Sequence, residues 1–254
     1  MRFSVIIPSC NNGEWIGKTL DSVLNQTFQD FEIIVVDDMS TDNSVEIIKS
    51  KLRPSVDIFV ENQSKRLNGG SRNEGILRAK GEYLIFIDSD DWFIDENVFE
   101  DIDRKLNGED ILFTGYITHS KTSDILVNPI ITDLEKSKMS FTCAIWTKVV
   151  KAELMKKALF PEGTLFEDRI QHYWLLDQAK TFTNLGRAAV IWNRENTNSI
   201  SISKENIWYT YRFNYCGELY RYIKTLPDGK FKDFVKDELK GYMESINKAV
   251  DDLW

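Results

Sequence analysis

The segment EYLIFIDSDD, residues 82–91, joins an unbroken apolar run to a cluster of acidic side chains. Tyr, Leu, Ile and Phe follow one another without a polar break, which predicts a β-strand buried on both faces and ending at Asp88. Residues 4–8 and 31–36 have the same character, and apolar residues at helical spacing follow each of them. Buried strands that alternate with helices predict an α/β fold, with a mostly parallel central sheet covered by helices on both faces.

Apolar periodicity and turn residues predict the other elements of the chain. Strands are expected at residues 4–8, 31–36, 57–60, 82–87, 110–117 and 188–192, and helices at residues 16–24, 45–52, 68–80 and 167–179. A strand, a turn and a helix are expected within residues 145–159, and two C-terminal helices from Lys204 onward, separated at residues 226–229. Ligands of parallel sheets bind at the carboxyl ends of the strands, so the acidic clusters after residues 36 and 87 are expected at the site.

The composition is typical of a soluble globular protein, with 42% hydrophobic and 28% charged residues in a chain of 254. No run approaches the roughly 18 consecutive apolar residues of a membrane span. The formal net charge of −8 argues against nonspecific binding to nucleic acid, which needs a dense basic surface. The three cysteines are widely spaced, which predicts reduced thiols, a cytoplasmic protein and no zinc site.

Asp88 and Asp90 are two residues apart directly after a predicted strand. Side chains at this spacing on an extended backbone point the same way, so both carboxylates are expected to face one cation. Hard divalent ions such as Mg²⁺ or Mn²⁺ prefer carboxylate oxygens and often share their sites with substrate phosphates. The alternative is that these residues cap the next helix, with Asp95 and Glu96 as further charges in its first turn.

Two further clusters precede or open predicted helices. Asp37 and Asp38 are followed by STD (40–42), so an ordinary strand-to-helix turn with capping side chains explains them nearly as well as a ligand site does. The segment NGGSRNEG (68–75) has glycines that allow close backbone approach, amides suited to a phosphate, and Arg72 to pair with one. It lacks the pattern of a P-loop or of a dinucleotide-binding fingerprint.

These three clusters, in this order and at this spacing, resemble glycosyltransferase family 2, whose members have the GT-A fold. The resemblance covers about residues 3–202. The motifs that carry it are SVIIP (4–8), QTF (26–28), VDD (36–38) with STD (40–42), RNEG (72–75) and FIDSDD (86–91), and more loosely WTK (146–148), FPEG (160–163), FED (166–168), Arg194 and NSI (198–200). It implies a nucleotide-sugar-binding half (1–117) and an acceptor-binding half (118–203) of one GT-A domain, followed by a C-terminal helical extension (204–254).

The resemblance implies where the donor would bind. Pro8 and its neighbours Ser9 and Asn11 would lie along the nucleotide, and Asp38 would hydrogen-bond the base, typically uracil. Arg72 would lie by the donor pocket and help to hold the base or the diphosphate. A nucleotide sugar, with a UDP-sugar favoured, is therefore the expected donor.

The same resemblance implies the chemistry. Asp90 would be the direct ligand of a Mn²⁺ or Mg²⁺ ion, and Asp88, with Ser89, would lie nearer the ribose or the sugar. Asp168 would be the catalytic base, with Glu167 as the fallback; the alternative for this pair is a solvated helix N-terminus. The reaction would be an inverting single displacement, in which a carboxylate accepts the proton of the attacking hydroxyl and a cation neutralises the leaving diphosphate.

The sequence departs from the family pattern at two positions. Cys10 stands two residues after the proline, where family members usually carry an aromatic residue that stacks on the base. Looser base recognition, or a nucleotide other than a uridine derivative, is therefore expected as an alternative. Met39 stands where glycine is usual, which is expected to be a tolerable change in the turn.

The acceptor is expected to be a saccharide or another compound with a hydroxyl group, bound by the second half of the chain. Trp146 is the candidate for a sugar-stacking platform, and His119 and His172 are candidates for a third metal ligand or an acceptor contact. The aromatic and basic residues from Glu205 onward are expected to pack on the body of the protein or on a second subunit in a homodimer. Contact with the inner face of the membrane is the alternative for this segment.

Two functions of other kinds compete with sugar transfer. The first is a binding module that holds a nucleotide sugar without turnover, which has no use for a catalytic base. The second is a nucleotidyltransferase, which usually has a glycine-rich loop with a basic residue near the N-terminus. The segment SCNNGE (9–14) does not supply such a loop.

Overall fold

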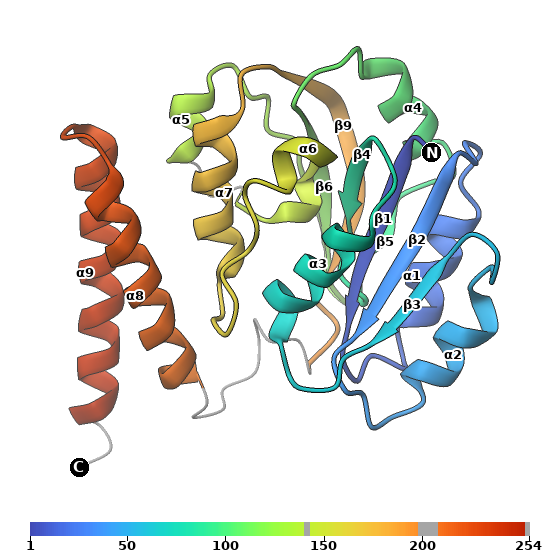
Figure 1. Cartoon of the computed structure of the whole chain (residues 1–254), viewed down its shortest axis with the longest axis horizontal. Coiled ribbons are helices and arrows are strands. Elements are labelled where there is room, and N and C mark those ends of the chain that lie inside the picture. Colours follow the sequence, from blue (N-terminus) through green and yellow to red (C-terminus); the bar gives the residue numbers. More distant parts are fainter. Residues whose placement is uncertain (140–142, 198–207, 252–254) are drawn as a thin grey trace.

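One mixed β-sheet forms the centre of the molecule, and helices lie against both of its faces (Figure 1). The computed structural model of the chain describes residues 1–139, 143–197 and 208–251. Within these residues the strands are arranged in the order β3-β2-β1-β4-β8-β6-β9-β5, and β7 pairs with β6.

Four neighbouring parallel strands form the N-terminal part of the sheet: β1 (Phe3–Ser9), β2 (Phe31–Asp37), β3 (Ile58–Glu61) and β4 (Tyr83–Phe86). Every residue of β1, β2 and β4 is buried, as expected for strands covered on both faces. In the register of β1 and β2, Ser9 lies beside Asp37, so the loops after these strands emerge at the same edge. Asp88 follows β4 at this edge, where ligands of parallel sheets bind.

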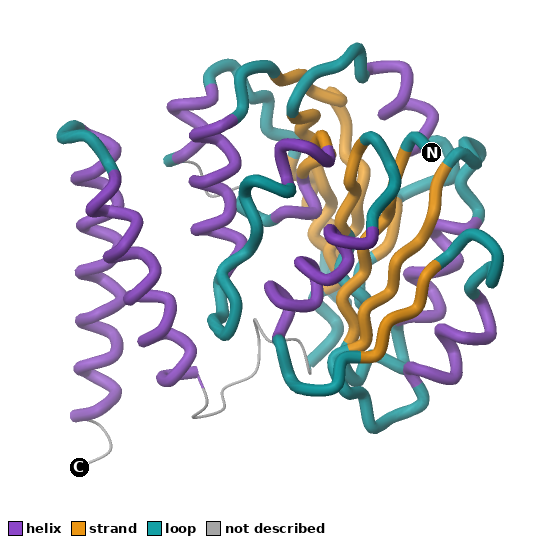
Figure 2. Tube along the Cα trace, in the orientation of Figure 1, coloured by secondary structure: helices purple, strands orange, loops and turns teal. Residues whose placement is uncertain are grey.

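The second half of the chain adds strands of both directions to the same sheet. Figure 2 shows the strands, in orange, gathered in the middle of the fold with helices on either side. Strand β8 (Lys148–Lys151) lies between β4 and β6 (Ile111–His119) and is antiparallel to both. Strand β6 and its parallel neighbour β9 (Phe182–Asn193) therefore run in the same direction as β4. Two short strands, β5 (Trp92–Phe93) and β7 (Asp124–Val127), pair antiparallel with β9 and β6. Strand β6 crosses the predicted boundary at residue 117, and that division of the domain stays a prediction.

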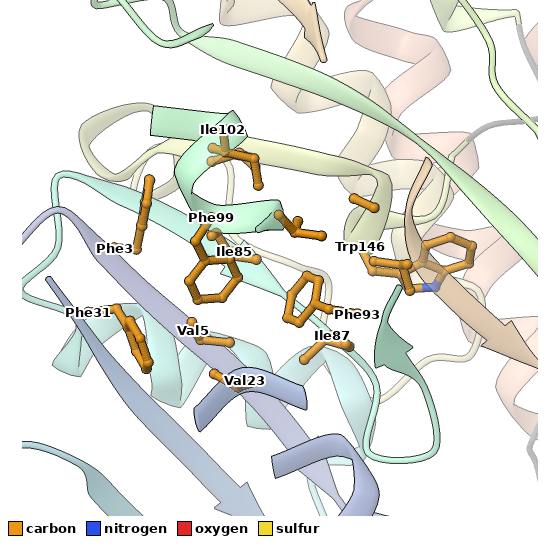
Figure 3. Close-up of a cluster of buried hydrophobic side chains, with 14 of the residues drawn as sticks. Phe3, Val5, Val23, Phe31, Ile85, Ile87, Phe93, Phe99, Ile102 and Trp146 are labelled. Atoms are coloured by element: carbon orange, nitrogen blue, oxygen red, sulfur yellow. The ribbon is translucent and has the colours of Figure 1, made fainter. Parts of the chain in front are cut away.

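Helices bury the two faces of the sheet in two separate apolar clusters. Helices α1 (Ile16–Leu24), α2 (Ser44–Lys51) and α4 (Val98–Lys105) cover one face. In that cluster Phe99 packs edge-on against Phe31, with ring centroids 5.3 Å apart (Figure 3). Helices α3 (Leu67–Arg78), α6 (Ala152–Met155) and α7 (Glu167–Gln178) cover the other face, and α5 (Leu134–Lys138) packs on α7. The predicted layers are confirmed.

Two long C-terminal helices, α8 (Trp208–Thr225) and α9 (Lys230–Asp251), pack together and lie beside α7, away from the sheet (Figure 1). We call this pair the C-terminal hairpin. A third apolar cluster, which includes Ile170, Tyr173, Tyr215 and Leu219, joins it to α7. The two helices and the break between them are as predicted, although the expected start at Lys204 lies outside the described residues.

The predictions of local structure were wrong at several positions. Strands β5 and β7 and helices α4 and α5 were not predicted. Strands β5 and β7 and helix α5 have at most five residues, too few for a clear periodicity, whereas α4 has eight residues and a buried face formed by Val98, Phe99 and Ile102. The alternative role of Asp95 as a first-turn charge is wrong, because α4 begins at Val98 and Asp95 pairs with Arg187 at 2.7 Å. The predicted caps of the second helix are only partly present: the N-cap Asn43 makes no side-chain cap bond, and Asp42 accepts from the N–H of Ser44 instead.

Met39 adopts the left-handed backbone conformation, with φ of 65°. This conformation favours glycine, because a Cβ crowds the following carbonyl. The side chain is 44% exposed and needs no room in the core. The departure from the family's usual glycine is therefore accommodated, at a cost in backbone strain.

Candidate active site

A cavity of about 490 Å³ lies at the carboxyl ends of β1 and β4. Most of the site residues expected from the sequence line it: Pro8, Arg72, Asp88, Ser89, Asp90, Trp146, Glu167 and Asp168. They come from both halves of the chain, so the fold collects side chains that are far apart in the sequence. The remaining three expected residues, Ser9, Asn11 and Asp38, lie outside the cavity lining.

Arg72 links the two acidic motifs of the cavity. It lies on α3, where Gly75 lets the helix approach β1 so closely that a Cβ would lie 2.6 Å from a β1 side chain. The Arg72 side chain is 1% exposed; its Nη2 donates to Asp88 at 2.6 Å, and its Nη1 donates to Asp168 at 3.0 Å and to Glu167. The partners of Arg72 in the structure are thus three carboxylates. The expected contact of Arg72 with the nucleobase or the diphosphate of a donor stays a prediction.

Burial raises the pKa of both acidic residues at the start of α7. Desolvation, and then the charge of Asp168, raise the pKa of Glu167 to about 7 although Arg72 opposes them. Desolvation is also the main cause that raises the pKa of Asp168, while Arg72 and Lys148 act in the opposite direction. The guanidinium of Arg72 is itself fully buried, but the three carboxylates outweigh desolvation and raise its pKa. A carboxylate pair with raised pKa values suits the acceptance of a proton near neutral pH.

The backbone around this pair is held in an uncommon conformation. Phe166, the N-cap residue of α7, has φ of 63°, which is left-handed and rare for an aromatic residue. Glu167 and Asp168 therefore begin the helix, where its dipole favours negative charge. The backbone N–H of Ile145 donates a hydrogen bond to Asp168 from the neighbouring segment. Conformations of this kind persist only where the surroundings stabilise them, and they are common at functional sites.

A hydrogen-bond network of two asparagines includes the carboxylate of Asp90. Nδ2 of Asn196 donates to Asp90 at 2.7 Å and also lies 3.2 Å from Oδ1 of Asn12. Nδ2 of Asn12 in turn donates to the hydroxyl of Ser89 at 2.6 Å. Burial, and then the charge of Asp88, raise the pKa of Asp90 to about 6. Neither asparagine was predicted as a site residue, since isolated Asn residues carry no spacing signal.

Of the three expected residues outside the cavity lining, Asp38 and Asn11 bind neighbouring loops and Ser9 is buried. Both oxygens of the Asp38 carboxylate accept bonds from within the protein, including the backbone N–H groups of Arg66 at 2.8 Å and Leu67 at 2.9 Å, where α3 begins. Asn11 binds the loop after β2 through its amide oxygen. Ser9 is 2% exposed at the end of β1. Contacts of these residues with a nucleotide stay predictions.

Aromatic rings form one wall of the cavity. The ring of Trp146 lies 4.9 Å from Tyr116 and 6.0 Å from Trp192. Trp146 is only 7% exposed, whereas Tyr116 and Trp192 are half-buried. An acceptor contact for Trp146 stays a prediction, and Tyr116 and Trp192 are candidates that the sequence analysis missed.

The two histidines lie away from the cavity lining. Nδ1 of His119 lies 2.6 Å from Asp124, at the pairing of β6 with β7. His172 is fully buried on α7, and its Nε2 lies 3.1 Å from the carbonyl of Ser137. Burial lowers the pKa of His172 well below its usual value, so its ring is neutral. Their role as metal ligands or acceptor contacts is not supported by these positions.

The carboxylates of the cavity fit a cation that arrives with a substrate. In the part of the chain that the structure describes, no group of three or more His, Cys, Asp or Glu side chains is arranged to hold a metal. Asp88 and Asp90 nevertheless line the same cavity, and their repulsion contributes to the raised pKa of Asp90. Sites for Mg²⁺ often consist of one or two carboxylates completed by water and substrate phosphates.

Comparison with known proteins decides the family. The model of the family described as Glycosyl transferase family 2 matches residues 4–144, more than half of the chain. The chain belongs to glycosyl transferase family 2. The match includes Asp38, Arg72 and Asp90 but ends before Asp168, so the assignment of a base rests on the geometry of the cavity.

Relatives of this family 2 chain include bacterial glycosyltransferases. It is 29% identical over 228 residues to the poly(ribitol-phosphate) beta-N-acetylglucosaminyltransferase TarP of Staphylococcus aureus. The aligned region covers 80% of this chain and 67% of TarP. It is 34% identical over 173 residues to the poly(ribitol-phosphate) beta-glucosyltransferase of Bacillus spizizenii, covering 63% of this chain and 27% of that protein. It also spans 29% of the glycosyltransferase GlyA of Streptococcus pneumoniae, at 29% identity. The chain therefore corresponds to less than a third of two of these relatives.

Solved structures share the fold. The crystal structure of S. aureus TarS 1-349 in complex with UDP-GlcNAc matches with a TM-score of 0.71 at 23% identity, covering 96% of this chain and 73% of that one. The mannosyltransferase PcManGT from Pyrobaculum calidifontis, in complex with GDP-Man and Mn²⁺, matches with a TM-score of 0.60 at 15% identity, covering 98% of this chain and 74% of that one. The predicted family and the predicted GT-A fold are confirmed.

No described helix has the length and apolar character needed to cross a membrane. The expected cytoplasmic location, contact with a membrane surface and homodimer stay predictions.

Proposed function

We propose that this chain is an inverting glycosyltransferase that moves a sugar from a nucleoside diphosphate to an acceptor hydroxyl. One observation carries the proposal: Arg72 joins Asp88, Glu167 and Asp168 in one cavity at the carboxyl ends of the strands. Carboxylates that suit the cation of a donor diphosphate and a carboxylate that suits the deprotonation of an acceptor thus line the same cavity. A single displacement needs both groups around one reacting carbon.

Asp168 is the proposed base. Its side chain is 21% exposed, whereas that of Glu167 is 8% exposed, so Asp168 is the more accessible to an acceptor hydroxyl. Its contacts with Arg72 and with the amide of Ile145 fix the direction of the carboxylate. A carboxylate held in this way accepts the proton of the hydroxyl as the new glycosidic bond forms. Glu167 remains the fallback.

Asp90, with Asp88, is the proposed site for Mn²⁺ or Mg²⁺. Either ion would neutralise charge on the leaving diphosphate. The proposal is supported by the two carboxylates in the cavity lining and by the Mn²⁺ complex of PcManGT. Asn196 and Asn12 orient Asp90 and Ser89 in the same network.

A UDP-sugar is the proposed donor. UDP-GlcNAc and UDP are bound in structures of TarS, whereas GDP-Man is bound in PcManGT. The identity of TarS is higher, 23% against 15%, which favours uridine. Cys10 lines the cavity where an aromatic residue is usual, so a GDP-sugar is the alternative. The proposed acceptor is a saccharide or polyol hydroxyl, in keeping with the poly(ribitol-phosphate) transferases among the relatives.

The released product tests the proposal. The chain would be incubated with UDP-glucose, UDP-N-acetylglucosamine or GDP-mannose, with Mn²⁺ and with free saccharides or polyol phosphates as acceptors. Sugar transfer releases a nucleoside diphosphate, and an acceptor should accelerate that release. Release of pyrophosphate would indicate a nucleotidyltransferase, and tight binding without release would indicate a binding module.

The pH dependence should report the ionisation of Asp168. We expect kcat/KM for donor turnover to rise with pH and to level off once Asp168 is unprotonated, because burial raises the pKa of this carboxyl above its usual value and the base must be unprotonated. Lys148→Met removes a positive charge that lowers the pKa of Asp168, so it should move the acidic limb to higher pH. A profile from pH 5 to 9 measures this. An acidic limb at the same pH in both proteins would contradict the coupling of Lys148 to Asp168.

A further inference from the structure

The residues on either side of Glu167 and Asp168 both contact the C-terminal hairpin. On one side, the ring of Phe166 lies 6.2 Å from Tyr215 on α8 and 6.3 Å from Tyr242 on α9, measured between centroids. On the other side, Nη1 of Arg169 forms an ion pair with Glu238 of α9 at 2.9 Å. The acidic pair is thus bracketed by two anchors on the same two helices.

The first anchor holds the side chain of Phe166, the residue with the left-handed backbone. Tyr215 is fully buried, and its ring packs edge-on against Tyr242 at 4.9 Å, so the two tyrosines form a fixed surface for the phenyl ring. The loop before α7 is also attached to α8, because Nδ2 of Asn214 donates to the carbonyl of Gly163 at 2.9 Å. These contacts stabilise the conformation in which α7 begins at Glu167.

The second anchor is largely removed from water. The Glu238 side chain is 11% exposed and that of Arg169 is 19% exposed. The other carboxylate oxygen of Glu238 accepts a hydrogen bond from the hydroxyl of Tyr173, one turn further along α7, at 2.7 Å. A largely buried ion pair with a second hydrogen bond constrains geometry far more than a surface pair does.

The hairpin also reaches the cavity itself. Tyr242 lines the cavity together with Phe166 and Arg169, the two residues that flank the acidic pair. Helix α9 is therefore part of the wall around the acidic pair, although the family match ends at residue 144.

We propose that the C-terminal hairpin positions the catalytic carboxylates, with Glu238 and Tyr242 as positioning residues, and that it closes the cavity beside Asp168. This role rests on the proposed function, in which Asp168 is the base. A base displaced by about 1 Å loses much of its effect on the rate, while donor binding at the other end of the cavity is preserved.

Glu238→Gln tests the proposal, since it removes the charge that pairs with Arg169 and keeps the size of the side chain. Glu244→Gln is the matched control: it lies on the same helix, is 68% exposed and pairs only loosely with Lys240 at 3.9 Å. The first readout is amide hydrogen exchange of residues 164–171 without any ligand. We expect exchange in this segment to be about tenfold faster in Glu238→Gln and unchanged in Glu244→Gln.

The second readout is UDP release from UDP-N-acetylglucosamine and UDP-glucose with Mn²⁺. Glu238→Gln should lower kcat roughly 10- to 100-fold and leave KM for the donor within about twofold. Glu238→Asp should recover part of kcat, because it restores the charge. Tyr242→Leu supplies the same comparison if Glu238→Gln does not fold, with Tyr242→Phe as its conservative partner.

Parental exchange and parental kcat in both Glu238→Gln and Tyr242→Leu would overturn the proposal. Faster exchange spread over the whole chain, with kcat and KM changed together, would also overturn it in favour of a purely structural role. If the parent neither releases UDP from either donor nor is stabilised by either, the proposed donor is wrong, whereas the exchange comparison still decides whether the hairpin positions the pair.

Discussion

Asp168→Asn should transfer sugar about 10²- to 10⁴-fold more slowly than the parent, which is the range that a positioned general base contributes. The amide keeps the shape of the carboxylate and can still accept the hydrogen bond from the N–H of Ile145. It has no basic oxygen to take the proton of the acceptor. KM for the donor should therefore stay within about twofold of the parental value, because the lost interaction is made only in the transition state.

Glu167→Gln is the comparison that separates the two acidic residues. If Asp168 is the base, Glu167→Gln should reduce kcat much less than Asp168→Asn does, since its side chain is 8% exposed and is held by Arg72. Steady-state rates of nucleoside diphosphate release with a working acceptor measure both variants. Normal transfer by Asp168→Asn, with loss of transfer in Glu167→Gln, would assign the base to Glu167 instead.

Arg72→Met should lower the free energy of unfolding by about 3–5 kcal/mol, because it leaves charged carboxylates unpaired in a buried site. The arginine is 1% exposed and pairs with Asp88, Glu167 and Asp168. For a chain of this size the loss corresponds to a fall in Tm of roughly 10 °C. The deficit should be largest above pH 8 and shrink toward pH 5, since the carboxylates of the variant then take up protons in the folded state.

Arg104→Met is the matched control for Arg72→Met. Arg104 also contacts two acidic residues, Glu100 and Asp101, but its side chain is 67% exposed on α4. Surface pairs of this kind contribute little, so the change in unfolding free energy should stay below about 1 kcal/mol. Equal losses in the two variants, measured by urea denaturation at pH 8, would show that Arg72 does not hold the acidic motifs together.

The fold was predictable where strands are buried on both faces. Strands β1, β2 and β4 are short apolar runs ending in polar residues, and that pattern determines a parallel sheet and the edge where ligands bind. Strand β5 has two residues and β7 is mostly exposed, so neither has a detectable alternation of apolar and polar residues. The antiparallel position of β8 depends on tertiary pairing, which local periodicity does not reveal.

The residues of the candidate site were predictable from the sequence, but the contacts between them were not. Residue type and motif order identified Arg72, Asp90 and Asp168, which all line one cavity. The partner of Arg72 in the second acidic motif is 95 residues away, and no spacing rule indicates such a pair. The same holds for Asn12 and Asn196, which meet across 184 residues. The aromatic C-terminal helices gave no sign from sequence that one of their rings lines the cavity.

Thermal stability in the presence of a nucleotide sugar tests the central claim most directly. A ligand that binds only the folded chain, at about 100 times its Kd, stabilises it by about 2.7 kcal/mol, or roughly 5–10 °C in Tm here. The account predicts this shift with UDP-N-acetylglucosamine or UDP-glucose and Mn²⁺, its loss with a chelator, and its loss in Asp90→Ala. A shift of the same size with the chelator, or in Asp90→Ala, would contradict a metal-dependent donor site at Asp88 and Asp90.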